Sequence, residues 1–464
     1  MSELMHKFLQ DAEEKAFDRD HRRKIKFNIG KYDQAVEDGM ERQFQDLELA
    51  RERAAYIKHK SINELDKYLI EFEANFSSRG GKVLWAQDDK EAVKEIYKIL
   101  RKHDAKLVVK MKSMTSEELE LNAFLKKHKI EGVETDLGEY IVQLAGEKPY
   151  HILTPAMHKS KEDVAELFNQ KFETPIDSTP QQITLFVRQL LREKFITAEA
   201  GITGANFLIA DTGAVALTEN EGNGMMSFTF PKVHIVIAGI EKVIPSLKDL
   251  DLFWPLVATM GTGQKITAYN SIVSGPRQEG EIDGPEEMYV ILIDNGRTNL
   301  LEQTEQRRSL SCIHCGACLN ACPVYRNIGG HTYNTPYSGP IGSVITPWMF
   351  GMKEYKHLSF ASTLCGKCSD VCPVKINLHE QLLANRRDAV KLGYTTGSEK
   401  LLMFSWRRVM TKRWMLDYGK AGMRNYALRK FFAKNWGSRR ELPVIPEKNF
   451  KQLWLERRGI GNKR

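Results

Sequence analysis

The pattern of hydrophobic and polar positions changes character near residue 79. Residues 1–78 are rich in Glu, Arg, Lys and Ala, and this composition predicts a helical N-terminal segment. We expect its charged residues, such as Arg51, Glu52 and Arg53, to form a solvated face. Apolar residues recur there at helical spacing, as at Leu47, Ala50, Ala54 and Ile57.

Residues 79–295 alternate between short apolar runs and amphipathic stretches. This alternation predicts an α/β domain in which helices cover the faces of a parallel sheet. Two helices are expected at 89–103 and 116–128, the second begun by Ser116 as its cap. Strands are expected at 82–86, 106–110, 133–136, 150–153, 207–210, 214–217, 233–238 and 288–293.

The remaining chain divides into a cysteine-containing domain at 296–395 and a basic, Trp-containing region at 396–464. Residues 323–364 separate two runs of cysteines, and their Gly and Pro content predicts turns between short helices. A helix over 378–392 is expected to close an all-helical, ferredoxin-like domain.

Charge is distributed unevenly along the 464 residues. The chain carries a net charge of +8, but residues 401–464 hold 17 Lys or Arg against 4 acidic residues, which leaves the rest at about −5. The basic region also contains Trp406, Trp414, Trp436 and Trp454. Because aromatic residues and Arg dominate interface hot spots, it is interpreted as a contact surface for a partner subunit. An amphipathic cap on the protein's own core and attachment to a membrane surface are the alternatives.

The N-terminus lacks the pattern of a signal peptide, and no uncharged apolar run reaches the length of about 18 residues that a membrane span needs. A cytoplasmic protein without a transmembrane segment is therefore expected. Nothing outside the basic region resembles a nucleic-acid reading module, so no nucleic-acid partner is expected.

All seven cysteines lie in two runs, each ending in Cys-Pro. The first run has the C-x-x-C-x-x-C-x-x-x-C-P spacing of bacterial ferredoxins, in which three thiolates hold one cluster and the fourth ligates the other. This order favours two iron-sulfur clusters over a zinc site or a set of disulfides. The runs contain Cys312, Cys315, Cys318 and Cys322, and then Cys365, Cys368 and Cys372.

The same rule applied to both runs divides the ligands into two sets. Cluster 1 receives Cys312, Cys315, Cys318 and Cys372, and cluster 2 receives Cys322, Cys365 and Cys368.

One ligand position of cluster 2 is therefore left without a cysteine, where the second run should begin at Ser362. The Ser362 oxygen, a residue from elsewhere such as His314 or His357, and an open iron all remain candidates. His331, which lies between the runs, is more typical of a packed or hydrogen-bonded residue than of a ligand. Nearby cations, Lys367 and Arg326, would stabilise a reduced cluster if they also lie close to it in space.

Residues 201–224 form the most distinctive stretch of the α/β domain, dense in glycine and small polar residues. Such residues at strand ends favour a ligand pocket, although tight turns and a polar loop would explain each residue singly. No dinucleotide or P-loop motif is present. The candidate pocket residues are Thr203, Asn206, Thr212, Glu219, Asn220, Glu221 and Asn223.

Together, the cysteine runs and the stretches G-I-T-G-A-N-F, T-E-N-E-G-N-G and G-G-H-T-Y resemble the lactate utilization protein B family over nearly the full length. The resemblance implies an iron-sulfur electron-transfer protein in the oxidation of L-lactate to pyruvate, which allows growth on lactate. It implies an α/β domain similar to the sugar-phosphate isomerase and CoA-transferase fold. It also implies two 4Fe-4S clusters on the cysteines assigned above, and two partners, a cysteine-rich protein and a second α/β protein.

An enzyme in its own right is the alternative. In that case the α/β pocket, around Glu219 and Glu221, or an open cluster iron would act on a small hydroxy or acyl acid. A scaffold with purely structural clusters is a third hypothesis.

Overall fold

The computed structural model describes residues 2–417, 419–437 and 440–459. Contacts between residues divide the chain into two compact units, Met1–Lys391 and Leu392–Arg464. The first unit contains the N-terminal helices, both sheets and all seven cysteines.

Four helices precede the first strand, and polar caps separate them. The side chain of Ser2 accepts a hydrogen bond at the start of the first helix, and those of Asp18 and Asp46 do the same at the next two. Each cap satisfies a backbone N–H that the helix itself leaves free. The helices are α1 (Glu3–Phe17), α2 (Arg19–Gln43), α3 (Leu47–Asn63) and α4 (Leu65–Ser78).

The larger sheet has six strands, all parallel, in the order β1-β10-β7-β4-β2-β3. The predicted parallel α/β architecture is therefore confirmed. The strands are β1 (Lys82–Ala86), β2 (Leu107–Lys110), β3 (Glu131–Glu134), β4 (Ala200–Thr203), β7 (Val233–Gly239) and β10 (Glu287–Ile293).

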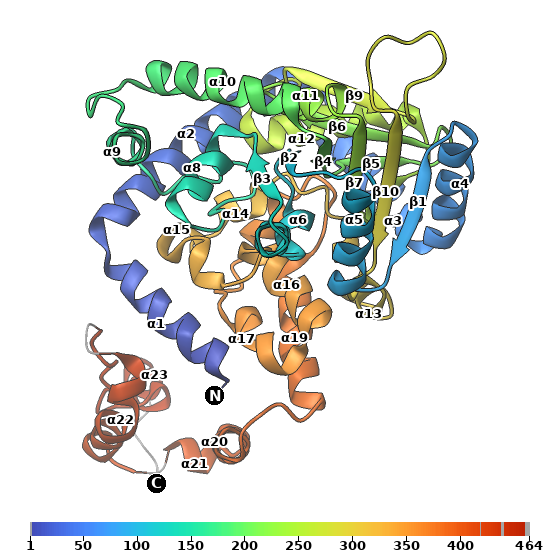
Figure 1. Cartoon of the computed structure of the whole chain (residues 1–464). Coiled ribbons are helices and arrows are strands. Elements are labelled where there is room, and N and C mark those ends of the chain that lie inside the picture. The colour runs from blue at the N-terminus through green and yellow to red at the C-terminus, as the bar shows by residue number, and fades with distance from the viewer. Residues whose placement is uncertain (1, 418, 438–439, 460–464) are drawn as a thin grey trace. The chain divides into compact units, whose positions relative to one another are not determined.

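Both faces of this sheet are buried. On β10, Tyr289 and Ile291 belong to the apolar cluster on the side of α5 (Asp89–Lys102), while Val290 and Leu292 belong to the cluster on the side of α4. This alternation follows from the two-residue period of a strand. Figure 1 shows α5 running along β1 and β10.

A second sheet of four strands, in the order β8-β5-β6-β9, extends the α/β region. Here β5 pairs in parallel with β8, and β6 runs antiparallel to β5 and β9. Next to this sheet, α2 packs on α12 (Leu250–Thr262) so closely that a Cβ at Gly39 would meet the Gly263 oxygen at 2.5 Å. The strands are β5 (Phe207–Ile209), β6 (Ala214–Glu219), β8 (Val243–Ile244) and β9 (Tyr269–Val273).

Several expected element boundaries are wrong. Residues 150–153 form bends instead of a strand. The backbone N–H of Tyr150 donates to Pro155 O within the same loop and not to a neighbouring strand. Ser113, not Ser116, caps the helix at this point, and α6 (Met114–Glu118) is separate from α7 (Leu121–Lys127). Glu120 breaks the expected single helix with a positive φ of 49°.

The sequence pattern also missed strands β4 and β9 and two helices, α9 (Lys161–Phe172) and α10 (Pro180–Thr197). Both helices begin with capping boxes, at Ser160 and Thr179. The shorter elements of this region are α8 (Leu137–Ala145), α11 (Asn223–Thr229), η1 (Ile240–Lys242) and η2 (Leu247–Asp249).

The cysteine-containing region is built from short helices, as predicted. Its buried residues share one apolar core with α1, α2, α12 and the second sheet, so the α/β region and the cysteine runs pack as one body. The elements are α13 (Arg297–Leu301), η3 (Arg307–Ser311), α14 (Ala317–Ala321), α15 (Tyr325–Ile328), η4 (His331–Tyr333), α16 (Gly339–Phe350), α17 (Met352–Phe360), α18 (Lys367–Asp370) and α19 (Leu378–Lys391).

The second unit consists of helices whose described side chains are largely exposed. Trp406 and Trp414 are 56% and 63% exposed. The helices are α20 (Gly397–Met410), α21 (Arg413–Asp417), α22 (Ala421–Trp436) and α23 (Phe450–Arg457). Across the described parts of both units, no helix combines the length and apolar character that a membrane span requires.

Candidate iron-sulfur centres and an adjoining pocket

The first cysteine run folds into a tight loop that leads into α14. Cys312 directly follows η3, and the backbone N–H of His314 donates to its Sγ at 3.4 Å. His314 and Gly316 adopt left-handed backbone conformations, with φ of 56° and 76°. Cys315 lies between these two residues and Cys318 lies in the following helix, so the turn brings three sulfurs to one side of the loop.

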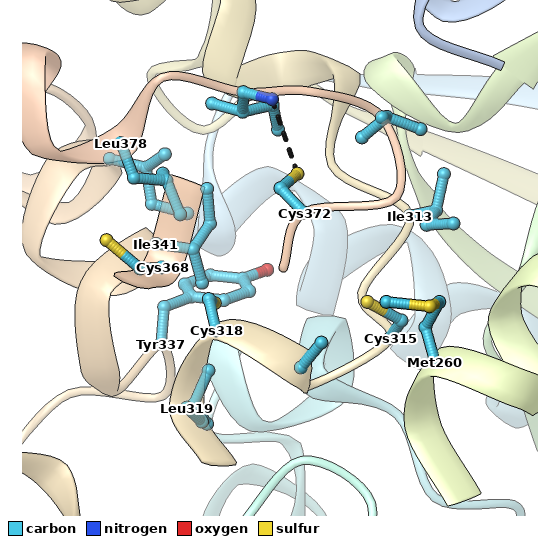
Figure 2. Close-up of a cluster of buried hydrophobic side chains, with 14 of the residues drawn as sticks. Met260, Ile313, Cys315, Cys318, Leu319, Tyr337, Ile341, Cys368, Cys372 and Leu378 are labelled. Atoms are coloured by element: carbon cyan, nitrogen blue, oxygen red, sulfur yellow. Dashed lines mark hydrogen bonds between the residues drawn. The ribbon is translucent and has the colours of Figure 1, made fainter. Parts of the chain in front are cut away.

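The four thiols assigned to cluster 1 line a single, mostly apolar cavity. Figure 2 shows Cys315, Cys318 and Cys372 around a common space, with Cys368 set apart from them. The structure therefore brings Cys372 from the second run to the three cysteines of the first. The apolar walls include Ile313, Leu319, Ile341, Val374, Ile376 and Leu378.

The electrostatics of this cavity oppose four free thiolates. Burial raises the pKa of Cys312 to about 11 and holds the pKa values of Cys315, Cys318 and Cys372 above the usual range. The neighbouring thiolates raise the pKa of Cys318 further, because buried like charges repel. A bound metal ion reverses this cost by deprotonating the thiols that coordinate it.

The other three cysteines form a second group. Burial and the nearby thiolates of Cys322 and Cys365 raise the pKa of Cys368 to about 11. Cys365 is exposed, and a hydrogen bond from the backbone N–H of Lys367 lowers its pKa. The seven thiols thus separate into a group of four and a group of three.

Ser362 stands where this second group lacks a cysteine, and its loop repeats the loop of the first run. Leu364 and Gly366 have φ values of 54° and 82°, close to those of the corresponding residues in the first loop. The N–H of Leu364 donates to Ser362 Oγ at 3.1 Å, as the corresponding N–H donates to the sulfur of Cys312. The hydroxyl of Ser362 therefore holds the place of a first-cysteine sulfur.

The histidines considered as ligands have other contacts. His314 lines the cavity of the first group, away from the vacant position of the second. His357 shares a hydrogen bond between its Nδ1 and Glu354 O at 3.1 Å. His331 shares one between its Nε2 and Lys148 O at 2.7 Å, which agrees with the packed role predicted for it.

Burial raises the pKa of Cys322. Arg326, one of the two cations expected near the clusters, lies close enough to oppose this rise in pKa. Arg326 also forms an ion pair with Asp33 at 2.7 Å. Lys367 has an exposed side chain, so only its backbone N–H contacts the cysteine group.

The prediction of a wholly solvated face on the third helix is wrong for Arg51. Glu52 and Arg53 are exposed, but the guanidinium of Arg51 donates from Nη2 to Cys372 O at 2.9 Å and to Asp370 O at 2.6 Å. Arg51 thereby fixes the loop that carries Cys372. Carbonyl oxygens at the end of this loop need a donor, and the helix supplies it.

Lys58 is a second cation that the sequence analysis missed. Its Nζ donates to Glu241 O at 2.6 Å and to Val243 O at 3.2 Å, and burial lowers its pKa to about 7. Helical spacing puts Arg51 and Lys58 on the same face of the helix as Ala54, which is one of its apolar positions. That pattern could have predicted that both cations lie on the buried face.

A buried ion network joins the α/β region to the cysteine-containing region. Arg297 donates from Nη1 and Nη2 to the two oxygens of Glu118, both at 2.9 Å, and from Nε to Glu241 at 2.5 Å. The hydroxyl of Tyr337 donates to Glu118 as well. Arg297 is 2% exposed, so these partners satisfy a fully desolvated cation.

A polar cavity of about 350 Å³ lies at the carboxyl ends of β2 and β4. It adjoins the cysteine cavity, since both are lined by Met114, Ile152, His314 and Tyr337. Its position follows the rule that open α/β sheets bind ligands beyond the carboxyl ends of their strands.

Most of the residues predicted for this pocket line it. Thr203 is an exception, because its hydroxyl is hydrogen-bonded to His234 Nε2 at 2.8 Å inside the sheet, and Thr212 lies outside the cavity lining as well. Lys112 and Lys242, which the sequence analysis did not single out, are also part of the lining. The predicted residues found there are Asn206, Glu219, Asn220, Glu221 and Asn223.

Comparisons with known proteins agree with this geometry. Residues 69–293 match the model of the LUD domain, and residues 308–376 match that of a 4Fe-4S dicluster domain. Lactate utilization protein B of Bacillus cytotoxicus is 41% identical over 425 residues, which cover 89% of each chain. The chain belongs to the lactate utilization protein B family. The member from Anoxybacillus flavithermus is 38% identical over 471 residues, 94% of this chain and 99% of that protein.

A crystal structure of a DUF162 family protein from Deinococcus radiodurans aligns with 49% of this chain and 98% of its own, at 14% identity and a TM-score of 0.29. The resemblance to the family that the sequence motifs indicated is therefore confirmed by relatives that span most of the chain.

Proposed function

We propose that this chain is the electron-transfer protein of a system that oxidises L-lactate to pyruvate, with two 4Fe-4S clusters as its redox groups. Membership of the lactate utilization protein B family and the dicluster domain support a role in lactate utilization and iron-sulfur binding. The observation that carries the proposal is the separation of seven thiols into a group of four that lines one cavity and a second group of three.

We infer the protein ligands of each cluster from the grouping of the thiols. Cys312, Cys315, Cys318 and Cys372 would hold cluster 1, and the second set would hold cluster 2. Because each run contributes to both groups, the two clusters would be held close together. The second set is Cys322, Cys365 and Cys368, with the oxygen of Ser362 as the fourth ligand, because its hydroxyl repeats the place and hydrogen bond of the first-cysteine sulfur.

Bound clusters would each accept and release one electron, so two of them match a two-electron oxidation. The chain tunes them through its own groups. The N–H of Ile376 donates to Cys372 Sγ at 3.3 Å, and a hydrogen bond to sulfur favours the more negative, reduced state. Apolar walls would exclude water from cluster 1, while the exposure of Cys365 would leave cluster 2 nearer to the surface for exchange with a partner.

We place partner contact on the second unit. Its basic charge suits an acidic surface, and its exposed tryptophans suit apolar contacts, on one of the two other lactate-utilization proteins, the cysteine-rich one or the second α/β one. Electrons from lactate would reach the clusters through such a complex.

The test is an anaerobic electron paramagnetic resonance spectrum of the purified chain mixed with L-lactate, with and without those two proteins. Cluster reduction that needs the partners supports a carrier. Clusters that stay oxidised in the full mixture, yet are reduced by dithionite, would contradict the proposed function.

A further inference from the structure

Lys242 places an amine at the boundary between the polar cavity and the cysteine cavity, where burial lowers its pKa and the nearby carboxylate of Glu241 raises it. It lines the polar cavity together with His314, and His314 also lines the cysteine cavity. Within the described residues, its Nζ forms neither an ion pair nor a hydrogen bond. Its neighbour Glu241 is already bound by Arg297.

The other charged groups of the cavity are committed to protein partners. Lys112 pairs with Asp136 at 2.7 Å. Glu219 accepts from the backbone N–H groups of Gly224 and Met225, at 2.6 and 2.8 Å. Burial raises the pKa of Glu139, and Glu221 accepts from the backbone N–H of Leu137 at 3.2 Å, so Lys242 is the cation left for a ligand.

The cavity also offers uncharged hydrogen-bonding groups. Asn206 uses its Oδ1 to accept from the N–H of Thr218 at 3.0 Å, so its amide N–H groups remain for a ligand. Thr218 and Thr267 are hydrogen-bonded to each other and to Asn270. A volume of about 350 Å³ accommodates a small organic molecule with water.

We propose that this cavity binds a small monocarboxylate of the 2-hydroxy or 2-oxo acid class, with its carboxylate on Lys242 and its hydroxyl or oxo group near Asn206. A single available cation matches a single carboxylate, and Asp136 and Glu221 would repel a multiply charged phosphate more strongly than a singly charged acid. The inference deepens the proposed function, because it brings the acid of that reaction beside cluster 1.

Binding has a consequence at the cluster. The charge of Lys242 acts on Cys312 as well as on His314. An anion on Lys242 neutralises that charge and disfavours the more negative, reduced cluster. Saturation with ligand therefore shifts the midpoint potential of cluster 1 downward and changes its spectrum in the reduced state.

The test uses the full, cluster-loaded chain under anaerobic conditions. Calorimetric titration with pyruvate is expected to show one saturable site, and Lys242→Gln is expected to weaken it by at least about tenfold, through loss of a charge-assisted hydrogen bond. Lys248→Gln, at an exposed lysine in η2, is the matched control and keeps wild-type affinity. Redox titration of both variants reports whether pyruvate moves the cluster 1 potential.

Two further variants keep the result decisive if Lys242→Gln loses its clusters. Lys242→Arg retains the cation and should retain binding, and Asn206→Ala should weaken it with the clusters intact. No saturable binding by the wild-type chain, or equal binding of inorganic phosphate, would overturn the pocket assignment. Partner-dependent cluster reduction would survive that outcome, so failure here is distinct from failure of the proposed function.

Discussion

The two cysteine loops differ at Ser362, which has an oxygen where the first loop has the sulfur of a cysteine. Its hydroxyl occupies the place of a thiol and accepts the same kind of backbone hydrogen bond at 3.1 Å. Replacing it tests whether this oxygen binds iron or only completes the turn.

Ser362→Ala is expected to change the paramagnetic resonance spectrum of reduced cluster 2 and leave that of cluster 1 unchanged. Ser362→Cys is expected to restore a fully liganded cluster with a different spectrum and potential, because thiolate replaces alkoxide. Ser398→Ala, in the second unit, is the matched serine control. Identical spectra for wild type and Ser362→Ala would mean that iron is not bound by this oxygen.

His234 couples stability to pH. Burial lowers its pKa to about 3, so the folded state keeps the ring neutral while the unfolded state takes up a proton below about 6.5. The unfolded state then binds more protons, and stability falls as pH drops from about 6.5 toward 3.

His234→Gln is expected to reduce this loss by up to about 1.4 kcal/mol per pH unit, the contribution of one proton. Urea unfolding of the variant and the wild type at pH 6.5 and 5, followed by circular dichroism, measures the difference. Parallel loss of stability in the two proteins would show that His234 is not the group responsible.

At the scale of elements, the Arg297 network holds α6, η1, α13 and the loop of Tyr337 together. The cost of desolvating Arg297 is offset only while Glu118 and Glu241 remain in place. Arg297 lies between the two regions that the family models match, and the hydrogen bond from Tyr337 to Glu118 joins those regions directly.

Arg297→Met is expected to destabilise the first unit by about 3–5 kcal/mol, because it leaves two buried carboxylates without their cation. Arg387→Met is the control, since its ion pair with Glu305 is exposed and screened by solvent, so its loss should change stability little. Thermal unfolding and the visible absorbance of the clusters report both variants. An equal loss of stability in the two variants would contradict a special role for this network.

Predictability from sequence differed between elements for physical reasons. Strands such as β7 and β10 are continuous apolar runs, typical of a buried parallel sheet, and were predicted nearly to the residue. The strand β4 was missed because glycine at 201 weakens a strand signal. It is needed there, since a Cβ would meet Ser227 O at 1.6 Å. The apolar run at 150–153 was mistaken for a strand because its burial comes from tertiary contacts, including that of Tyr150 with His21.

The candidate site was predictable where local spacing dictates chemistry and unpredictable where distant segments meet. Cysteine spacing alone predicted groups of four and three thiols, which the structure also brings together, and their role as cluster ligands stays a prediction. The contacts of Arg51, Lys58 and Lys242 depend on how α3 and η1 pack against the cysteine loops, and single-sequence patterns do not carry that information.

For the whole molecule, the division into two units predicts separate roles. Chain contacts separate residues 392–464 from the first unit, which contains every thiol and both cavities. A chain ending at Lys391 is expected to keep its clusters and lose association with its partners. Sedimentation of the mixed proteins measures the second effect.

The full chain with Arg407→Gln and Arg408→Gln tests the same surface without truncation. Loss of these charges should weaken association in a salt-dependent way and leave the fold intact. Undiminished association of the shortened chain would place the partner surface on the first unit.

The central claim is that seven thiols hold two clusters. Iron and sulfide analysis with Mössbauer spectroscopy of anaerobically purified protein tests it most directly. We expect about eight irons per chain in the wild type and about four in Cys315→Ser and in Cys368→Ser, each variant losing a different cluster. A single cluster in the wild type, or loss of both sets of signals in each variant while the protein stays folded, would contradict it.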